Sequence, residues 1–419
     1  MTRLFRRCAA GLFTAALGAS PGFAQTYATP LPPGPGFVTL PIPAGPMVAP
    51  VLMPVGAPTA APVAVYHYPG RVPATDCAVP GLGSPAVACG PTLTLTGEFL
   101  YWFAQASTLP PLVTAAGPGV PVPPGGALNR PDTDVRFGGT RADTAARPGG
   151  RFGLGYALSD RSGLEARFFF LGDSDDRFDG RSVPNGVTLG RPVTFAPIGL
   201  PTALPVATVS GLATTRLLGV DLDYRRRLDC GGCSQLDLLI GYRYLHLGDR
   251  VEVFNATPFQ LVGLGNAGVG LVSDSVRTRN SFYGPQVGVS YRRPLRAGFS
   301  LDALAKLSLG VTVARADLDG STTVGPAGVP VGLLVGPANT GHGSTSYFGA
   351  VPEASLGVGY AVCDTLRLTA GYTFLYWSKV RRAADQIDLS GGSGDRPALR
   401  DVTGDYWAQG VRLGAEWRF

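Results

Sequence analysis

The chain has 419 residues, of which 59 are glycine and 38 are proline, while only 15% are charged. This composition suits a fold with many strands and turns, and a hydrophobic content of 45% excludes a wholly disordered chain. The formal charge of +6 comes almost entirely from arginine, because Lys306 and Lys379 are the only lysines. We expect no nucleic-acid partner.

Residues 1–24 have the features of a secretory signal peptide. Three arginines precede the apolar run from Cys8 to Leu17, and small residues lie just before Gln25. The run is too short to span a bilayer, so we expect cleavage and export. No later stretch offers 18 consecutive apolar residues, so an exported membrane protein of this sequence would have to cross the bilayer with strands.

Residues 25–90 are rich in proline, alanine and glycine, with the densest proline motifs at 30–35 and 41–46. This composition favours an extended periplasmic linker without a packed core. A proline-motif ligand for a partner or for the cell wall is the alternative. Cys77 and Cys89 can form a disulfide just before the next region.

Residues 91–419 show the period-two alternation of strands with one apolar face. In 93–102, Leu93, Leu95, Phe99 and Tyr101 share one face, and the intervening residues face the other way. The same pattern recurs in about ten segments: 93–104, 150–158, 163–171, 212–228, 234–247, 281–292, 299–313, 346–361, 365–378 and 405–419.

The connections between these segments alternate in length. Five are long, at about 105–149, 172–211, 248–280, 314–345 and 379–404, and the intervening ones are short. Outer-membrane barrels have short periplasmic turns and long extracellular loops. The sequence therefore predicts an all-β, transmembrane, antiparallel up-and-down barrel of about ten strands, with twelve as the alternative. It would be integral to a bacterial outer membrane.

Charges on alternate positions predict an inner, lumen-lining face. Its predicted members are Glu98, Glu165, Arg167, Asp221, Asp223, Arg225, Asp237, Arg243, Asp302, Lys306, Glu353, Arg367, Arg412 and Glu416. The opposite face carries aromatic residues that we expect to contact lipid: Phe99, Tyr101, Phe168, Tyr242, Tyr372, Phe374, Tyr376 and Trp417. Ten strands would leave at best a narrow lumen.

The chain ends on a strand whose alternate residues include Trp417 and Phe419. Such an end resembles the C-terminal signal that the barrel-insertion machinery recognises. We therefore expect the barrel-insertion machinery to be one partner. The other expected partners are outer-membrane lipid, lipopolysaccharide, and a cell-wall or surface partner.

Several motifs resemble those of a bacterial outer-membrane family named putative beta-barrel porin seven. They include GEFLYW at 97–102, GYTFLYW at 371–377 and RRAADQID at 381–388. The remaining matching segments are 109–114, 137–139, 150–155, 163–168, 238–245, 280–284, 351–353 and 406–410. The resemblance implies a barrel fold, an outer-membrane location and a porin-like role. It implies no catalytic residues.

Candidate chemistry is sparse. Cys230 and Cys233 have the spacing of a redox pair, but they lie in a predicted short turn, where a disulfide or two idle thiols is the simpler interpretation. The glycine spacing at 263–268 matches a dinucleotide motif without the helix that it needs. The histidines are scattered, so we expect no metal, cofactor or catalytic triad, although His246 and His342 merit one test.

Three functions remain open. The first is a narrow or gated pore for small solutes, and the second is a plugged structural or surface-interaction barrel that acts through its long loops. A barrel-embedded hydrolase is a minor third. We expect the chain not to be an enzyme.

Overall fold

A computed structural model describes residues 93–419, apart from positions 124, 143–144, 184–185, 196–199, 229–233, 261–266, 326 and 392–394. The predicted signal peptide and linker lie outside the described residues, as do Cys77, Cys89, Cys230 and Cys233. Cys363 lies in the turn after β15 as a free thiol. None of the helices in the described ranges is long and apolar enough to cross a membrane.

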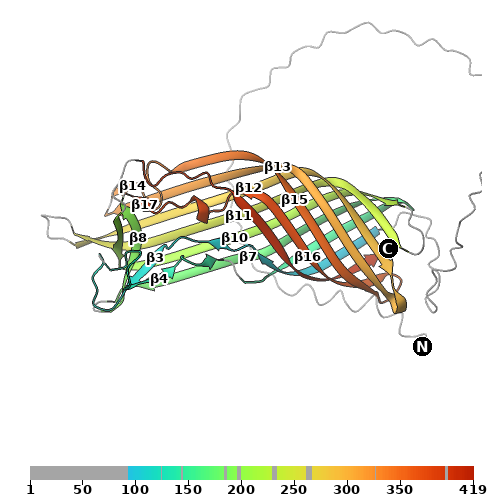
Figure 1. Cartoon of the computed structure of the whole chain (residues 1–419), viewed down its shortest axis with the longest axis horizontal. Helices are drawn as coiled ribbons and strands as arrows, with labels where there is room; N and C mark the ends of the chain where they lie inside the picture. Colours follow the sequence, from blue (N-terminus) through green and yellow to red (C-terminus); the bar gives the residue numbers. More distant parts are fainter. Residues whose placement is uncertain are drawn as a thin grey trace, which may run out of the picture. The chain divides into compact units, whose positions relative to one another are not determined.

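Ten antiparallel strands form a closed barrel, as the sequence predicts (Figure 1). They follow one another around the barrel in chain order, and β12 pairs with β13 to close the ring that β1 and β18 join on the other side. The strands are β1 (Leu93–Ala104), β6 (Arg147–Ser159), β7 (Ser162–Arg181), β10 (Thr208–Leu228), β11 (Gln235–Gln260), β12 (Ala267–Pro294), β13 (Phe299–Val324), β15 (Gly341–Ala361), β16 (Leu366–Val380) and β18 (Gly404–Arg418).

The middle of β13 shows why this sequence closes into a membrane barrel. Leu307 and Leu309 are more than 40% exposed on the outside, whereas Lys306 and Ser308, which alternate with them, are buried inside. Exposed apolar side chains on successive strands form an outer belt that suits lipid. Closure of the sheet pairs the backbone groups of the edge strands, which would find no hydrogen-bond partner in the hydrocarbon layer.

Several strands are much longer than predicted. β11, β12 and β13 have 26, 28 and 26 residues, so most of the predicted loops 248–280 and 314–345 are strand. The cause is that the apolar residues of these strands change from the outer face to the inner face. Beyond the belt, the outward residues are polar, such as Arg250 and Arg277, while the inward ones, such as Val251 and Val276, are apolar and buried. This reversed alternation conceals the strand from an analysis that looks for an apolar outer face.

Loops cap the end of the barrel that lies away from the C-terminus (Figure 1). The cap contains a five-stranded sheet of β3 (Val113–Ala116), β4 (Thr133–Phe137), β8 (Thr188–Phe195), β9 (Leu200–Val206) and β17 (Ser390–Gly391), and a pair of β2 (Ser107–Thr108) and β5 (Arg141–Ala142). The short elements η2 (Arg296–Gly298), β14 (Ala327–Val329) and η3 (Ala384–Gln386) complete the chain.

The cap and the barrel wall share one hydrophobic core. Leu112, Leu334 and Ile387 come from the connections, and they pack with the inward residues Val253 and Leu318 of the barrel. Each of these side chains is at most 3% exposed. The loops therefore fold onto the inner wall at this end.

The lipid-facing belt yields a first prediction. Leu307 lies in the middle of the outward series of β13 that runs from Phe299 to Val313, so Leu307→Arg places a charge near the centre of the hydrocarbon layer. We expect the free energy of unfolding in lipid vesicles, measured by urea titration, to fall by about 2–4 kcal/mol. Ser321→Arg, on the same strand and face but beyond the belt, should change it little. Equal losses in both variants would contradict the placement of the belt.

Candidate functional site in the barrel lumen

A cavity of about 1110 Å³ opens at the end of the barrel that carries the short turns. We call it the vestibule. Its wall includes the turn residue Asp160 and the C-terminal Phe419. Nine of the predicted lumen residues line it: Glu98, Glu165, Arg167, Arg225, Asp237, Asp302, Arg367, Arg412 and Glu416.

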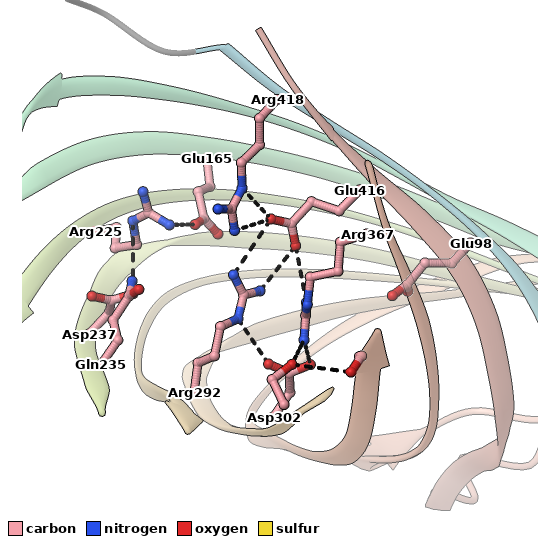
Figure 2. A network of polar contacts seen from close by, with 12 residues as sticks. Glu98, Glu165, Arg225, Gln235, Asp237, Arg292, Asp302, Arg367, Glu416 and Arg418 are labelled. Atoms are coloured by element: carbon pink, nitrogen blue, oxygen red, sulfur yellow. Dashed lines mark hydrogen bonds and ion pairs between the residues drawn. The ribbon is translucent and has the colours of Figure 1, made fainter. Parts of the chain in front are cut away.

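Ion pairs across the vestibule join strands that are distant in the sequence (Figure 2). Arg292 of β12 contacts Asp302 at 2.9 Å and Glu416 of β18 at 3.0 Å. Arg367 of β16 pairs with the same two carboxylates, and Arg418 also contacts Glu416. On the opposite wall Arg225 lies 3.1 Å from Glu165. The charges of the vestibule are therefore largely paired with one another.

The other five predicted lumen residues lie deeper, in what we call the central network. Arg243 of β11 donates two hydrogen bonds to Asp221 of β10, at 2.7 and 2.8 Å, and another to Glu353 of β15. Lys306 of β13 donates to Asp221 at 3.0 Å and to Asp223 at 2.6 Å. All five residues are at most 5% exposed. Bidentate and charge-assisted bonds of this kind offset the cost of burying charge.

Three further residues extend the central network to the neighbouring wall. Arg151 of β6 contacts Glu353 at 3.3 Å and Glu98 of β1 at 3.6 Å, and Arg412 of β18 contacts Glu98 at 2.6 Å. The four carboxylates of Glu98, Asp221, Asp223 and Glu353 thus face the four basic groups of Arg151, Arg243, Lys306 and Arg412, so 4 − 4 leaves a formal charge of zero.

A layer of large apolar side chains, the aromatic layer, follows the central network toward the cap. On β1 and β11 it occupies inward positions that follow the charged ones: Leu245 and Leu247 come after Arg243 on β11, and Leu100 and Trp102 come after Glu98 on β1. The members with 0% exposure include Leu100, Trp102, Leu217, Leu245, Leu247, Phe282, Val351, Leu375, Trp377 and Tyr406.

The aromatic layer is packed against itself and against the central network. The rings of Trp102 and Phe169 have centroids 5.9 Å apart, and those of Phe282 and Trp377 are 6.1 Å apart. The Arg151 guanidinium lies 5.3 Å from the Trp102 ring centroid and 5.5 Å from that of Phe169. A cation over an aromatic face is attracted by the ring quadrupole. Arg151 therefore joins the ionic and apolar layers.

Neither Arg151 nor the aromatic layer is among the predicted site residues, although the sequence carries a signal for each. Arg151 has the same parity as the charged inner face, between two outward residues. The aromatic layer is visible in uninterrupted apolar runs, such as 99–103 and 168–171, because a strand that is apolar at every position has two apolar faces. The predicted lipid-facing set takes only the outward aromatics of these runs, such as Phe99 and Phe168, and leaves the inward Trp102 and Phe169 without a role.

The predicted lipid-facing aromatics point outward in the structure. Seven of them are 38–53% exposed: Phe99, Tyr101, Phe168, Tyr242, Tyr372, Phe374 and Trp417. Tyr376 is partly covered. At the chain end Phe419 is 68% exposed, while its backbone N–H still donates to the Leu93 carbonyl at 2.9 Å.

Polar bonds attach the cap to the inner wall above the aromatic layer. Asn280 of β12 donates to the Arg381 carbonyl and accepts from the Arg381 N–H, both at 2.8 Å. Arg382 pairs with the buried Asp249 of β11 and lies 5.3 Å from the Tyr406 ring centroid. Arg381 and Arg382 belong to the 381–388 motif, so this motif holds a loop inside the barrel mouth.

The two histidines singled out from the sequence both lie at outward positions. His246 contacts the Ser281 hydroxyl at 3.3 Å, and His342, whose side chain is 86% exposed, lies 3.7 Å from Asp317. Neither faces the vestibule. Within the described ranges, no group of three or more His, Cys, Asp or Glu residues has the arrangement of a metal site.

The central network yields a second prediction. Lys306→Met leaves Asp221 and Asp223 with one fewer basic partner in a buried site, so we expect a loss of about 3–5 kcal/mol in the free energy of unfolding. Lys306→Met combined with Asp223→Leu removes a charge of each sign, and most of the stability should return. Urea midpoints in lipid vesicles measure both, and strictly additive losses would contradict a coupled network.

The cap yields a third prediction. Burial raises the pKa of Asp388, but the N–H groups of Ala398 and Ser390 and the Arg396 guanidinium outweigh burial and lower this pKa from 3.8 to about 2. A lowered pKa stabilises the fold above pH 4, and this stabilisation is lost as the pH falls toward 2. Pepsin cleavage of the 388–400 loop should therefore accelerate between pH 4 and pH 2. In Asp388→Asn, cleavage should be faster at pH 4 and, after correction for pepsin activity, independent of pH. Parallel profiles would refute this assignment.

The chain is similar, at low sequence identity, to several solved structures. The chain is 10% identical to the outer membrane protease OmpT from Escherichia coli, with 78% of this chain and 97% of that chain covered and a TM-score of 0.40. The translocator domain of the autotransporter NalP from Neisseria meningitidis is 11% identical, with 80% and 90% covered and a TM-score of 0.28. The anion-selective porin from Comamonas acidovorans is 11% identical, with 79% and 100% covered and a TM-score of 0.16.

At these TM-scores, none of the three structures transfers an activity or a solute to this chain. Among curated proteins no relative is found. The family described as "Putative beta barrel porin-7 (BBP7)" matches residues 95–419, which is most of the chain and all but two residues of the barrel region that the structure describes. The chain therefore belongs to this family and is an outer-membrane β-barrel protein.

Proposed function

We propose that the protein is a closed barrel in its resting state and that it acts at the outer surface through its cap, as a structural or surface-interaction protein. The observation that carries the proposal is the aromatic layer. Trp102, Phe282, Trp377 and Tyr406 come from four strands around the lumen, and all four side chains are 0% exposed. A ten-stranded barrel is close in size to those whose interiors are filled by side chains.

The cap supports the same proposal. A loop that served only as a flexible connection would not need Asn280 and Asp249 to bind Arg381 and Arg382 inside the barrel mouth. The shared core of the cap and the wall holds these loops in one arrangement. A rigid surface suits recognition of a partner, because little conformational entropy is lost on binding.

A gated pore is the second candidate, and the vestibule favours it. A cavity of about 1110 Å³ reaches from the short-turn end to the central network, and a solute entering from the periplasm would meet paired charges there. Opening would require those ion pairs to exchange partners and the aromatic layer to move. The proposal assigns no catalytic role to His246 or His342, because neither faces the vestibule.

Planar-bilayer conductance tests the proposal. The purified, refolded mature chain, with folding confirmed by heat-modifiable gel mobility, should pass no stepwise current. Trp102→Ala combined with Trp377→Ala removes two rings from the aromatic layer and should give current steps. Tyr101→Ala combined with Phe374→Ala, which removes two lipid-facing rings from the same strands, should remain silent. Stepwise currents through the unaltered chain would overturn the closed-barrel proposal and establish the pore.

A further inference from the structure

Four arginines lie together on the outer surface, on the cap side of the apolar belt. We call Arg250 of β11, Arg277 and Arg279 of β12, and Arg315 of β13 the basic patch. Their side chains face outward on three adjacent strands, and those of Arg250, Arg277 and Arg279 are 43%, 39% and 53% exposed. Arg315 is exposed as well.

The strand register places like charges directly opposite one another in this patch. Arg250 pairs in register with Arg277, and Arg279 pairs in register with Arg315. Side chains at directly opposed positions have Cβ atoms about 4.5–5.5 Å apart, and like charges there destabilise a sheet. Two such pairs side by side indicate a surface that an anion from outside would stabilise.

Acidic neighbours compensate the patch only in part. Arg250 and Arg277 share the single carboxylate of Glu252, and Arg279 lies 3.2 Å from Asp317. Among the described residues, none forms an ion pair or a hydrogen bond with Arg315. Glu252 and Asp319 both lie one row farther from the belt, opposite Ser275, so the four basic groups and the three carboxylates of Glu252, Asp317 and Asp319 leave 4 − 3 = +1.

The patch lies next to the aromatic edge of the lipid belt. On β12 the outward residue Tyr283 comes four positions after Arg279, on the side of the belt. Its ring centroid is 5.1 Å from that of Tyr244 on β11. Phe348 of β15 continues this row and is 65% exposed. Aromatic side chains at such a level mark the boundary between acyl chains and headgroups. The arginines are therefore at headgroup height.

The residue between two of the basic side chains is a glycine, and the His246 imidazole lies beside it, with Nε2 3.6 Å from where a Cβ on Gly248 would stand. Gly248 of β11 pairs in register with Arg279 on one side and with Arg216 of β10 on the other, so the position between these two arginines has no side chain. Arg216 is 61% exposed and pairs with Asp173. Arginine binds phosphate oxygens with a planar pair of donors, and a phosphate held between Arg216 and Arg279 would also lie next to the His246 ring.

We infer that the basic patch binds the phosphate groups of the outer-leaflet glycolipid, lipid A of lipopolysaccharide. The occupant follows from three features together: the excess of arginine, its height at the headgroups, and its position on the cap side, which topology places outside the cell. The acyl chains would lie on the belt below, along Leu307 and Leu309 of β13. The inference depends on the outer-membrane location and not on whether the lumen conducts.

Native mass spectrometry of the full mature chain in detergent, with bisphosphorylated lipid A as the probe, tests the inference. Arg279→Gln combined with Arg315→Gln should lower lipid A affinity at least tenfold. The matched control is Arg226→Gln combined with Arg293→Gln, which removes two exposed arginines from β10 and β12 at the opposite rim of the barrel. This control should bind lipid A as the unaltered chain does. Dephosphorylated lipid A and phosphatidylglycerol should bind the unaltered chain at least tenfold more weakly.

A stability measurement separates binding from misfolding. Without lipid A, removal of the like-charge pair should leave the melting temperature of Arg279→Gln/Arg315→Gln equal to or above that of the unaltered chain. With lipid A, the unaltered chain should gain more, because a ligand stabilises the state that binds it. Equal lipid A affinity in the two proteins, or equal affinity of the unaltered chain for phosphatidylglycerol, would overturn the inference.

Discussion

The constraint on which the structure depends is that backbone N–H and C=O groups in lipid must find partners within the protein. Strands can meet it only when the sheet closes, and here the β12–β13 pairing completes the ring. Closure then divides every strand into an outer and an inner face. The outer face is selected for contact with acyl chains, and the inner face must be filled or hydrated. The ion pairs, the aromatic layer and the cap are all ways in which the inner face is satisfied.

The interior changes character along its length. Paired charges line the vestibule at the short-turn end, a buried neutral network follows, and then come the aromatic layer and the core of the cap. Buried ion pairs contribute little net stability, since desolvation offsets attraction, but breaking one is costly. Arg243 and Lys306 therefore set the arrangement of the strands around them more than they add to stability. The apolar layers contribute by removing large side chains from water.

The outer surface changes character at the same level as the inner one. Below the Tyr244–Tyr283 pair it is apolar, and above it the basic patch and its acidic neighbours take over. Water surrounds the upper part of β11, β12 and β13, so their apolar side chains turn inward and help to hold the cap. The same three strands thus serve a membrane wall and a soluble domain, with a reversal of which face is apolar.

The sequence by itself determined about ten strands, their order and, within the lipid belt, which residues of each strand face inward. Period two and the alternation of long and short connections are local properties, and the bounds of β1 were predicted to the residue. Parity also grouped Asp221, Arg243, Lys306 and Glu353 on the inner face. Only the tertiary structure decided which of these charges meet, because partners such as Arg243 and Glu353 are 110 residues apart and depend on how the barrel closes. The tertiary structure also decided what the two apolar faces of 99–103 contact: the outer face lies in the lipid belt and the inner face packs in the aromatic layer. A run of apolar residues does not by itself say what each face contacts.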